Sequence, residues 1–184
     1  MKKQPLYYHP EDRVTKTLRD IHPGEIVVVR YKPILPDQTC YEYIGFVKSI
    51  GETDIQLSSS QFPRAHSNVP TSELSLDLNH IGYLMPMQPA GKLTPIVGNK
   101  EKASITDFPN LNDYNIGHAV LLRDYLLGFN ITGFVDQLTA RQFSLSSINQ
   151  KKVHEGITPN HTHFTLESLA KENLAIAPLV GKTD

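Results

Sequence analysis

Short apolar runs separated by turn-forming residues make up most of the chain. Ile26 to Tyr31 and Ala119 to Leu122 are largely apolar stretches with the length of a buried strand. Leu74, Leu76 and Leu78 alternate with polar residues, a period of two that is typical of a strand with one buried face. Thirteen prolines and eleven glycines are spread along the 184 residues, which favours short strands and turns over long helices. The pattern predicts an all-β protein.

Two longer strands are predicted at Tyr43 to Ile50 and Ile131 to Leu138, each with a glycine in its interior. An interior glycine marks a sharp bend or a close backbone approach, by which a short sheet curls on itself. The remaining predicted strands are 55–59, 142–146 and the alternating Thr162, Phe164 and Leu166. The segments around Pro95 and Pro178 are expected to be closing edge strands, where a missing N–H is tolerated.

The chain contains an internal duplication. Gly45-Phe46-Val47 recurs 88 residues later as Gly133-Phe134-Val135, and Leu-Ser-Ser follows each at the same distance, at 57–59 and 145–147. Two further matches keep the order with other offsets: 24–30 with 117–123, 93 residues apart, and 94–98 with 177–181, 83 apart. Five-residue deletions at two turns of the second copy explain both changes, since length changes in turns cost little. Chance similarity between glycine-containing strands is the alternative.

Each copy predicts one small five-stranded β-barrel. The first barrel, with a short N-terminal helix, is expected over 1–98 and the second over 113–184. Residues 99–112 hold charged residues and no apolar periodicity, so they are expected to be a linker. Pro10 to Leu18 has proline, acids and later basic residues in the order that a short helix prefers, with two apolar residues four apart for docking.

The arrangement of these elements resembles that of the Sm-like family. It consists of a helix, a strand, a bent strand with Gly-x-Val, a turn and a strand that ends in Leu-Ser-Ser. In that family a glycine stands two residues before an apolar residue on the second strand, as in Gly45-Phe46-Val47 and Gly133-Phe134-Val135. The resemblance implies a five-stranded SH3-type barrel in each copy. It also implies rings that bind single-stranded RNA, because Sm-like proteins usually do both.

The family's base-binding residues are not found in either copy. Gly51 occupies the position of the family's aspartate in the turn after the second strand, and 138–142 has neither polar residue of that motif. The short glycine-bearing second motif, which carries a phosphate-contacting basic residue, is not recognisable. The resemblance therefore assigns no RNA-binding residue in this chain.

Charge and composition exclude several classes of protein. The net charge is −1 and both halves are close to neutral, so the chain is not a basic sheath for nucleic acid. No apolar run reaches the length of a membrane helix, and the first residues lack the apolar region of a secretory signal. The single cysteine, Cys40, excludes an intrachain disulfide and fits a reducing compartment, so a cytoplasmic location without membrane contact is expected.

Histidines near the C-terminus are the best metal candidate. His161 and His163 lie two apart, so on a strand both side chains point to one face, and imidazole is a common ligand for zinc. His154 or Glu155 would supply a third ligand. The alternative is that these residues face solvent beside an inward-pointing Phe164.

Aromatic and basic residues of the first strands are the candidate partner-binding residues. Tyr31, Tyr41 and Tyr43 flank an insertion that the second copy lacks, and tyrosines on projecting elements are common anchors for protein or for stacked bases. The alternative is that they pack over the open end of the barrel. Arg30 and Arg123, matched between the copies, would contact phosphate, or else form a structural ion pair or end the strand in solvent.

The sequence predicts a non-catalytic protein without a cofactor. The repeated serines lack a nucleophile elbow, and no phosphate-binding loop or dinucleotide fingerprint occurs. Binding to a protein partner, or self-association, is the first hypothesis. Binding of single-stranded RNA by an Sm-like assembly is the second, and a metal-dependent enzyme at His154, His161 and His163 is the third.

Overall fold

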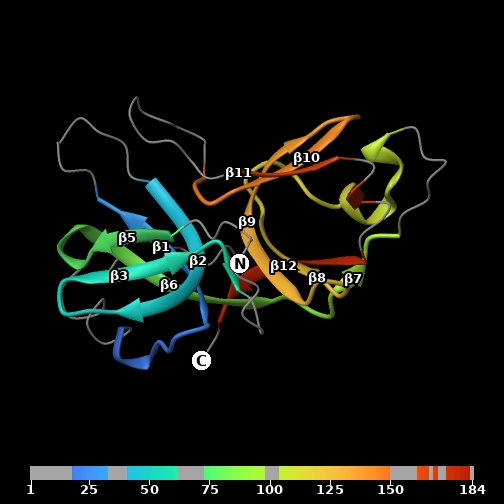
Figure 1. Cartoon of the computed structure of the whole chain (residues 1–184). Helices are drawn as coiled ribbons and strands as arrows, with labels where there is room; N and C mark the ends of the chain where they lie inside the picture. Colours follow the sequence, from blue (N-terminus) through green and yellow to red (C-terminus); the bar gives the residue numbers. More distant parts are fainter. Residues whose placement is uncertain are drawn as a thin grey trace, which may run out of the picture.

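The computed structural model describes residues 18–32, 41–61, 73–97, 104–149, 161–165, 168–169 and 173–182. Within these ranges the chain is all-β, as predicted, and its strands form one antiparallel sheet that curls like a half-barrel (Figure 1). The main path of the sheet runs β11-β10-β9-β8-β12-β6-β1-β2-β3-β5. No helix in the described part is both long and apolar enough to cross a membrane.

Apart from the short strands β4 and β7, which pair with β9 and β12, the strands of the first half form the left-hand group of Figure 1. Five of them follow the order β6-β1-β2-β3-β5. Their bounds are β1 Ile26–Tyr31, β2 Tyr41–Ile50, β3 Asp54–Ser58, β5 Glu73–Asp77 and β6 Ile81–Pro89. The two-residue strands β4 (Ser60–Gln61) and β7 (Thr94–Pro95) and the 3-10 helix η1 (Leu78–His80) complete this half.

The second half repeats the same order as β12-β8-β9-β10-β11. The bounds are β8 Ala119–Asp124, β9 Phe129–Leu138, β10 Gln142–Ser146, β11 His161–Thr165 and β12 Leu174–Gly181. Two 3-10 helices precede them, η2 (Ile105–Asp107) and η3 (Pro109–Leu111). The last strand of each half therefore pairs with the first strand of that half.

The glycine of Gly-x-Val has the same environment in both halves. Gly45 pairs with Val27 and Gly133 with Val120. A Cβ added at either glycine would lie 2.9 Å from the Cβ of a leucine on the next strand, Leu57 or Leu145, closer than real Cβ contacts. The predicted close backbone approach is thus confirmed, and it lets the long strand lie tightly against its neighbour as the sheet curls.

The position of the closing strands differs from the prediction. Pro178 pairs with Val120 of β8, and the residue in the same place of the first half is Pro86, paired with Val27, and not Pro95. Strand β12 is central, because it pairs with β8 as far as Pro178 and with β6 from Leu179 onward. The edge-strand prediction for Pro178 is wrong, since the proline stands where the strand changes partner and an N–H is not needed.

The two halves exchange equivalent contacts. Strands β6 and β12 pair antiparallel, and the Ala90 N–H donates to the Pro178 carbonyl (2.8 Å) as the Lys182 N–H donates to Pro86 (2.9 Å). Beyond β3, Ser60 pairs with Ile131 of β9, and beyond β10 Ile148 pairs with Tyr43 of β2. Such reciprocal contacts define an approximate two-fold axis, as in an isologous dimer.

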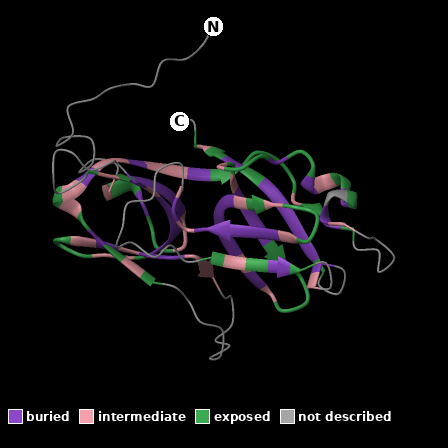
Figure 2. Cartoon of the chain, turned by 90° about the horizontal axis from the view of Figure 1, so that it is seen from above, coloured by how far each residue is buried: buried purple, intermediate pink, exposed green. Residues whose placement is uncertain are grey.

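Three apolar clusters form the core. One lies in each half, and the third lies between the halves on the approximate axis, with residues from both: Ile26, Val28, Ile44, Phe46, Met87, Leu121, Phe134 and Leu179. Each half also places one side chain in the other half's cluster, Ile96 in the second and Ile148 in the first. Figure 2 shows the long strands buried through the middle of the molecule and exposed residues mainly at its turns.

Two predicted segments are only partly described. Residues 18–20 form one turn of helix, and the rest of the predicted N-terminal helix lies outside the described residues. Of the predicted linker, residues 104–112 are described, and Ile105, Phe108 and Leu111 are buried in the core of the second half.

Candidate functional site

The three predicted tyrosines lie in or beside the core of the first half. Tyr41 and Tyr43 are only 6% and 4% exposed, and Tyr31 packs edge-on against Tyr43 with ring centroids 6.1 Å apart. Burial raises the pKa of Tyr43 above its ordinary value, and it does the same for Tyr31. Tyr41 and Tyr43 are thus packed in the apolar cluster of the first half, which leaves little of them for a partner to contact.

Arg30 forms a structural ion pair. Its Nη2 lies 2.6 Å from Oε1 of Glu42, directly across on β2, and its guanidinium lies over the ring of Tyr83, 4.9 Å from the centroid. Glu42 also accepts a hydrogen bond from the side-chain amide of Asn149 in the second half (3.1 Å). Burial, followed by the negative charge of Glu42, raises the pKa of the Tyr83 hydroxyl. The arginine charge is therefore neutralised within the fold.

Arg123 occupies the same place in the second half with different neighbours. The residue across from it on β9 is Asn130, where the first half has Glu42, and on β12 it is Ala175, where the first half has Tyr83. Its guanidinium lies over the ring of Tyr125, 5.1 Å from the centroid. Among the described residues no carboxylate lies within ion-pair distance of Arg123.

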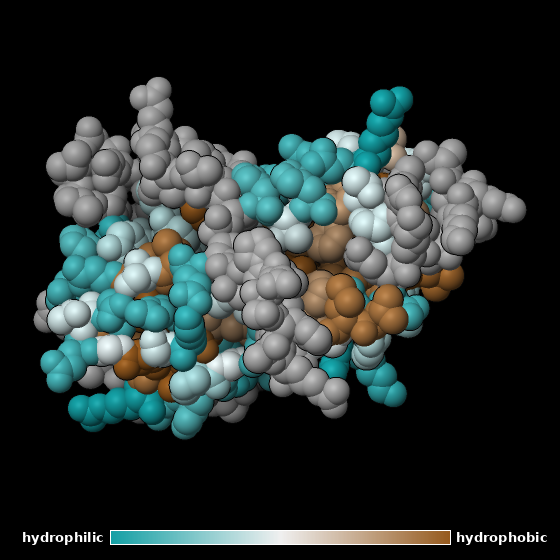
Figure 3. Space-filling view, in the orientation of Figure 1, coloured by the Kyte–Doolittle hydropathy of each residue, from teal (hydrophilic) through white to brown (hydrophobic). Residues whose placement is uncertain are grey.

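Large apolar side chains gather beside Arg123 at one end of the second half. Val97, Tyr125, Leu126 and Leu127 are 66%, 55%, 65% and 55% exposed, and we call them the apolar end. They flank the start of β12 because the Ile96 N–H donates to the Leu174 carbonyl (2.7 Å) while the Tyr125 N–H donates to Asn173 (3.0 Å). Figure 3 shows apolar surface gathered over the region of β7, β8 and β12.

The turn that carries Tyr125, Leu126 and Leu127 of the apolar end is held by Asp124. This residue is fully buried, and its Oδ1 accepts hydrogen bonds from the N–H groups of Leu126 (2.7 Å) and Leu127 (2.8 Å). Gly128 closes the turn at a φ of +72°, in the left-handed region that favours glycine. The exposed leucines therefore project from a fixed backbone.

His161 and His163 lie side by side on β11, as the spacing predicts, with ring centroids 5.7 Å apart. Nδ1 of His161 lies 3.2 Å from Oδ2 of Asp136, and Nδ1 of His163 lies 2.5 Å from the amide of Gln142. His154 lies outside the described residues. Within the described part of the chain, no three histidine, cysteine or acidic side chains converge as a metal site would require.

A serine near this cluster is not arranged as a nucleophile. The hydroxyl of Ser144 is buried and donates to Oδ2 of Asp136 (3.3 Å), the same oxygen that faces His161. The carboxylate thus stands between the serine and the imidazole, whereas nucleophilic catalysis needs the imidazole beside the hydroxyl.

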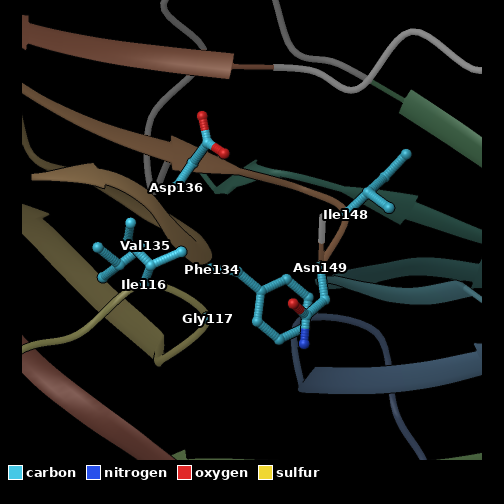
Figure 4. A pocket seen from close by; sticks show the side chains of 7 residues that line it. All are labelled: Ile116, Gly117, Phe134, Val135, Asp136, Ile148 and Asn149. Carbon is cyan, nitrogen blue, oxygen red and sulfur yellow. The ribbon is translucent and has the colours of Figure 1, made fainter. Parts of the chain in front are cut away.

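A pocket of about 210 Å³ lies where β9 meets the segment after β10. Figure 4 shows Ile116, Val135 and Ile148 around it, and the carboxylate of Asp136 turned away from the ring of Phe134. In the first half, Gln61 is the residue equivalent to Asn149, and its Nε2 lies 3.0 Å from where a Cβ of Gly24 would lie. The pocket is smaller than the ~300–1,000 Å³ of most small-molecule sites and suits a single side chain.

The comparisons with known proteins add no relative. No protein-family model matches this sequence, and a search of curated proteins finds no match. The apolar end was missed in the sequence, although three consecutive apolar residues at 125–127, between two strands, are the pattern that a turn normally avoids.

Proposed function

We propose that this chain is a non-catalytic binding protein that acts by protein contact, with a partner or a second copy, at the apolar end. The observation that carries the proposal is the group of large apolar side chains, each more than half exposed, three of which lie on a turn fixed by Asp124. Contiguous exposed apolar surface on a folded protein commonly marks an interaction site. The single cysteine in the sequence fits a cytoplasmic place of action.

We further propose that each half is a divergent Sm-like barrel. Support comes from the strand order, in which the last strand of each half pairs with its first, and from the close approach at Gly45 and Gly133. Both closing strands, β6 and β12, pair with each other inside the chain. The two barrels thus act as one linked pair, which presents the apolar end on its second member.

The test is the mass of the assembled protein, measured by light scattering across a size-exclusion peak. The protein is purified from its natural cells with and without nuclease, and absorbance is read at 260 and 280 nm. Leu126→Ser/Leu127→Ser is compared with wild type, and Ile116→Ser, another exposed apolar residue at 63%, is the matched control.

The expected result is a mass above 20.7 kDa for wild type and for Ile116→Ser, a loss of the added mass in the double variant, and no effect of nuclease. Excess mass that carries 260 nm absorbance and disappears with nuclease would favour single-stranded RNA as the partner. An unchanged mass in the double variant would overturn the proposal.

A further inference from the structure

The duplication allows two equivalent arginines to be compared within one molecule. Arg30 has a carboxylate across from it at 2.6 Å and an aromatic ring beside it. Arg123 has Asn130 and Ala175 in those two places. The second half thus has an arginine in the place of Arg30 but no carboxylate in the place of Glu42.

Arg123 lies on the same face of the sheet as Val97 and Tyr125 of the apolar end. Arg123, Ala175 and Pro95 are directly opposite one another on β8, β12 and β7, so their side chains share one face of the sheet. Ile96 points into the core at 4% exposure, and Val97 next to it points outward at 66%, because successive side chains of an extended chain alternate. Tyr125 joins this face through its contact with the guanidinium.

The surface therefore combines aliphatic side chains with one cation that has no carboxylate nearby in the described part of the chain. A partner that buried the apolar end would also remove water from Arg123. Because an unpaired buried charge is costly, a partner must supply an acceptor, and in an unmodified protein partner a carboxylate is the acceptor that pairs bidentately with a guanidinium.

We propose that the apolar end binds an acidic segment of a partner protein whose leucine-like side chains cover Val97, Leu126 and Leu127 while its carboxylate pairs with Arg123. This inference rests on the proposed function and names the chemistry of the partner. The partner would provide for Arg123 what Glu42 provides for Arg30 within the chain.

The test uses three labelled ten-residue peptides and fluorescence anisotropy with the full chain. The first peptide alternates leucine with aspartate and glutamate, the second replaces the acids with lysine, and the third keeps the acids and replaces leucine with serine. The chain is used as wild type, Arg123→Glu, Leu126→Ser/Leu127→Ser and Arg141→Glu. Arg141 is exposed in the turn at the opposite end of β9 and is the charge-matched control.

The expected result is that wild type and Arg141→Glu bind the acidic leucine peptide best. Arg123→Glu should weaken that peptide about fivefold to tenfold and strengthen the lysine peptide, since an attraction becomes a repulsion. Raising the salt concentration should weaken binding of the acidic peptide to wild type. Circular dichroism of each variant checks that the fold is kept.

Two other results have separate meanings. If acidic and lysine peptides bind wild type equally, and only the double leucine variant loses them, the apolar end binds protein but the acidic partner is ruled out. If no peptide binds, or if binding is equal in all four chains, the inference is overturned, and the mass measurement on the double leucine variant then decides the proposed function independently.

Discussion

Two glycines set the curvature of the sheet. Gly45 and Gly133 stand where the backbone of the following strand comes so near that a methyl group would meet the Cβ of a leucine at 2.9 Å and a serine carbonyl oxygen at 3.1 Å. Both neighbours belong to the buried part of the sheet, so neither moves aside cheaply. Close packing of this kind makes even one added carbon costly.

Gly133→Ala is expected to lower the free energy of unfolding by about 1–3 kcal/mol, because the added methyl group overpacks the contact between β9 and β10. Gln137→Ala, an exposed position on the same strand, should change it by less than about 0.5 kcal/mol. Urea unfolding followed by circular dichroism measures both. Equal stability of Gly133→Ala and wild type would show that the close approach is relaxed in solution.

A single ion pair ties the start of the first half to the end of the chain. Glu25 accepts hydrogen bonds from the Lys182 ammonium and from the His22 N–H (2.9 Å), and these lower its pKa below the usual value near 4.5. A lowered pKa adds stability that is present above the unfolded pKa and is lost as the pH falls through the folded pKa. The stabilisation by this ion pair is therefore present at neutral pH and is lost in the acid range.

In Glu25→Gln, the free energy of unfolding is expected to fall less between pH 6 and pH 3 than it does in wild type. The effect should stay below about 1 kcal/mol, because both side chains are partly exposed. Urea unfolding at several pH values gives the two curves, with Glu52→Gln in the exposed β2–β3 turn as control. Parallel curves for Glu25→Gln and wild type would mean that the pair does not persist in solution.

The β8–β9 turn is the element on which function is proposed to depend. Its backbone is held by Asp124, whose buried carboxylate serves two N–H groups at once. A preformed turn presents Leu126 and Leu127 without an ordering cost upon binding, which is how a small apolar surface gains affinity.

Asp124→Ala is expected to cost about 2 kcal/mol of unfolding free energy, because two partly buried N–H donors lose their acceptor. Asp124→Asn keeps an oxygen in the place of Oδ1 and should cost less. Peptide binding should fall further in the alanine variant than in the asparagine variant. Urea unfolding and fluorescence anisotropy measure the two effects, and equal behaviour of both variants would show that the turn forms without this cap.

Four strands of the first half could be predicted from the sequence, since apolar runs, interior glycines and the duplication indicate them, but its closing strand was expected around Pro95 and lies at Ile81–Pro89. The equivalence of Pro86 and Pro178 could not be predicted from the sequence, because the residues around Pro95 match those around Pro178 better. Only the pairing of Pro86 with β1 and of Pro178 with β8 shows that these two prolines occupy equivalent places. The different surroundings of Arg30 and Arg123 could not be predicted from the sequence either. Their difference depends on Glu42 and Asn130, which face them only once the strands are in register.

At the scale of the whole molecule, the chain is an internal pair related by an approximate two-fold axis. The closing strands of the two halves, β6 and β12, pair with each other. The cluster between the halves contains equivalent residues from both, such as Phe46 with Phe134 and Met87 with Leu179. The sheet therefore ends at β5 and β11 within the described part of the chain.

The fragment 1–98 is expected to form a homodimer. Removing the second half exposes the edge of β6 and the apolar side chains of Val28, Ile44 and Phe46, and a second copy offers an equivalent surface. Light scattering across a size-exclusion peak should give twice the fragment mass. A folded monomer would show that the first half needs no partner to cover this surface.

The most direct measurement is amide hydrogen exchange of the full chain, alone and in the assembly recovered from its natural cells. Slower exchange upon assembly is expected at the amides of 96–97 and 125–128, with no change at the turn 139–141. Protection confined to β5 or β11 would contradict binding at the apolar end and would place the contact at an edge of the sheet.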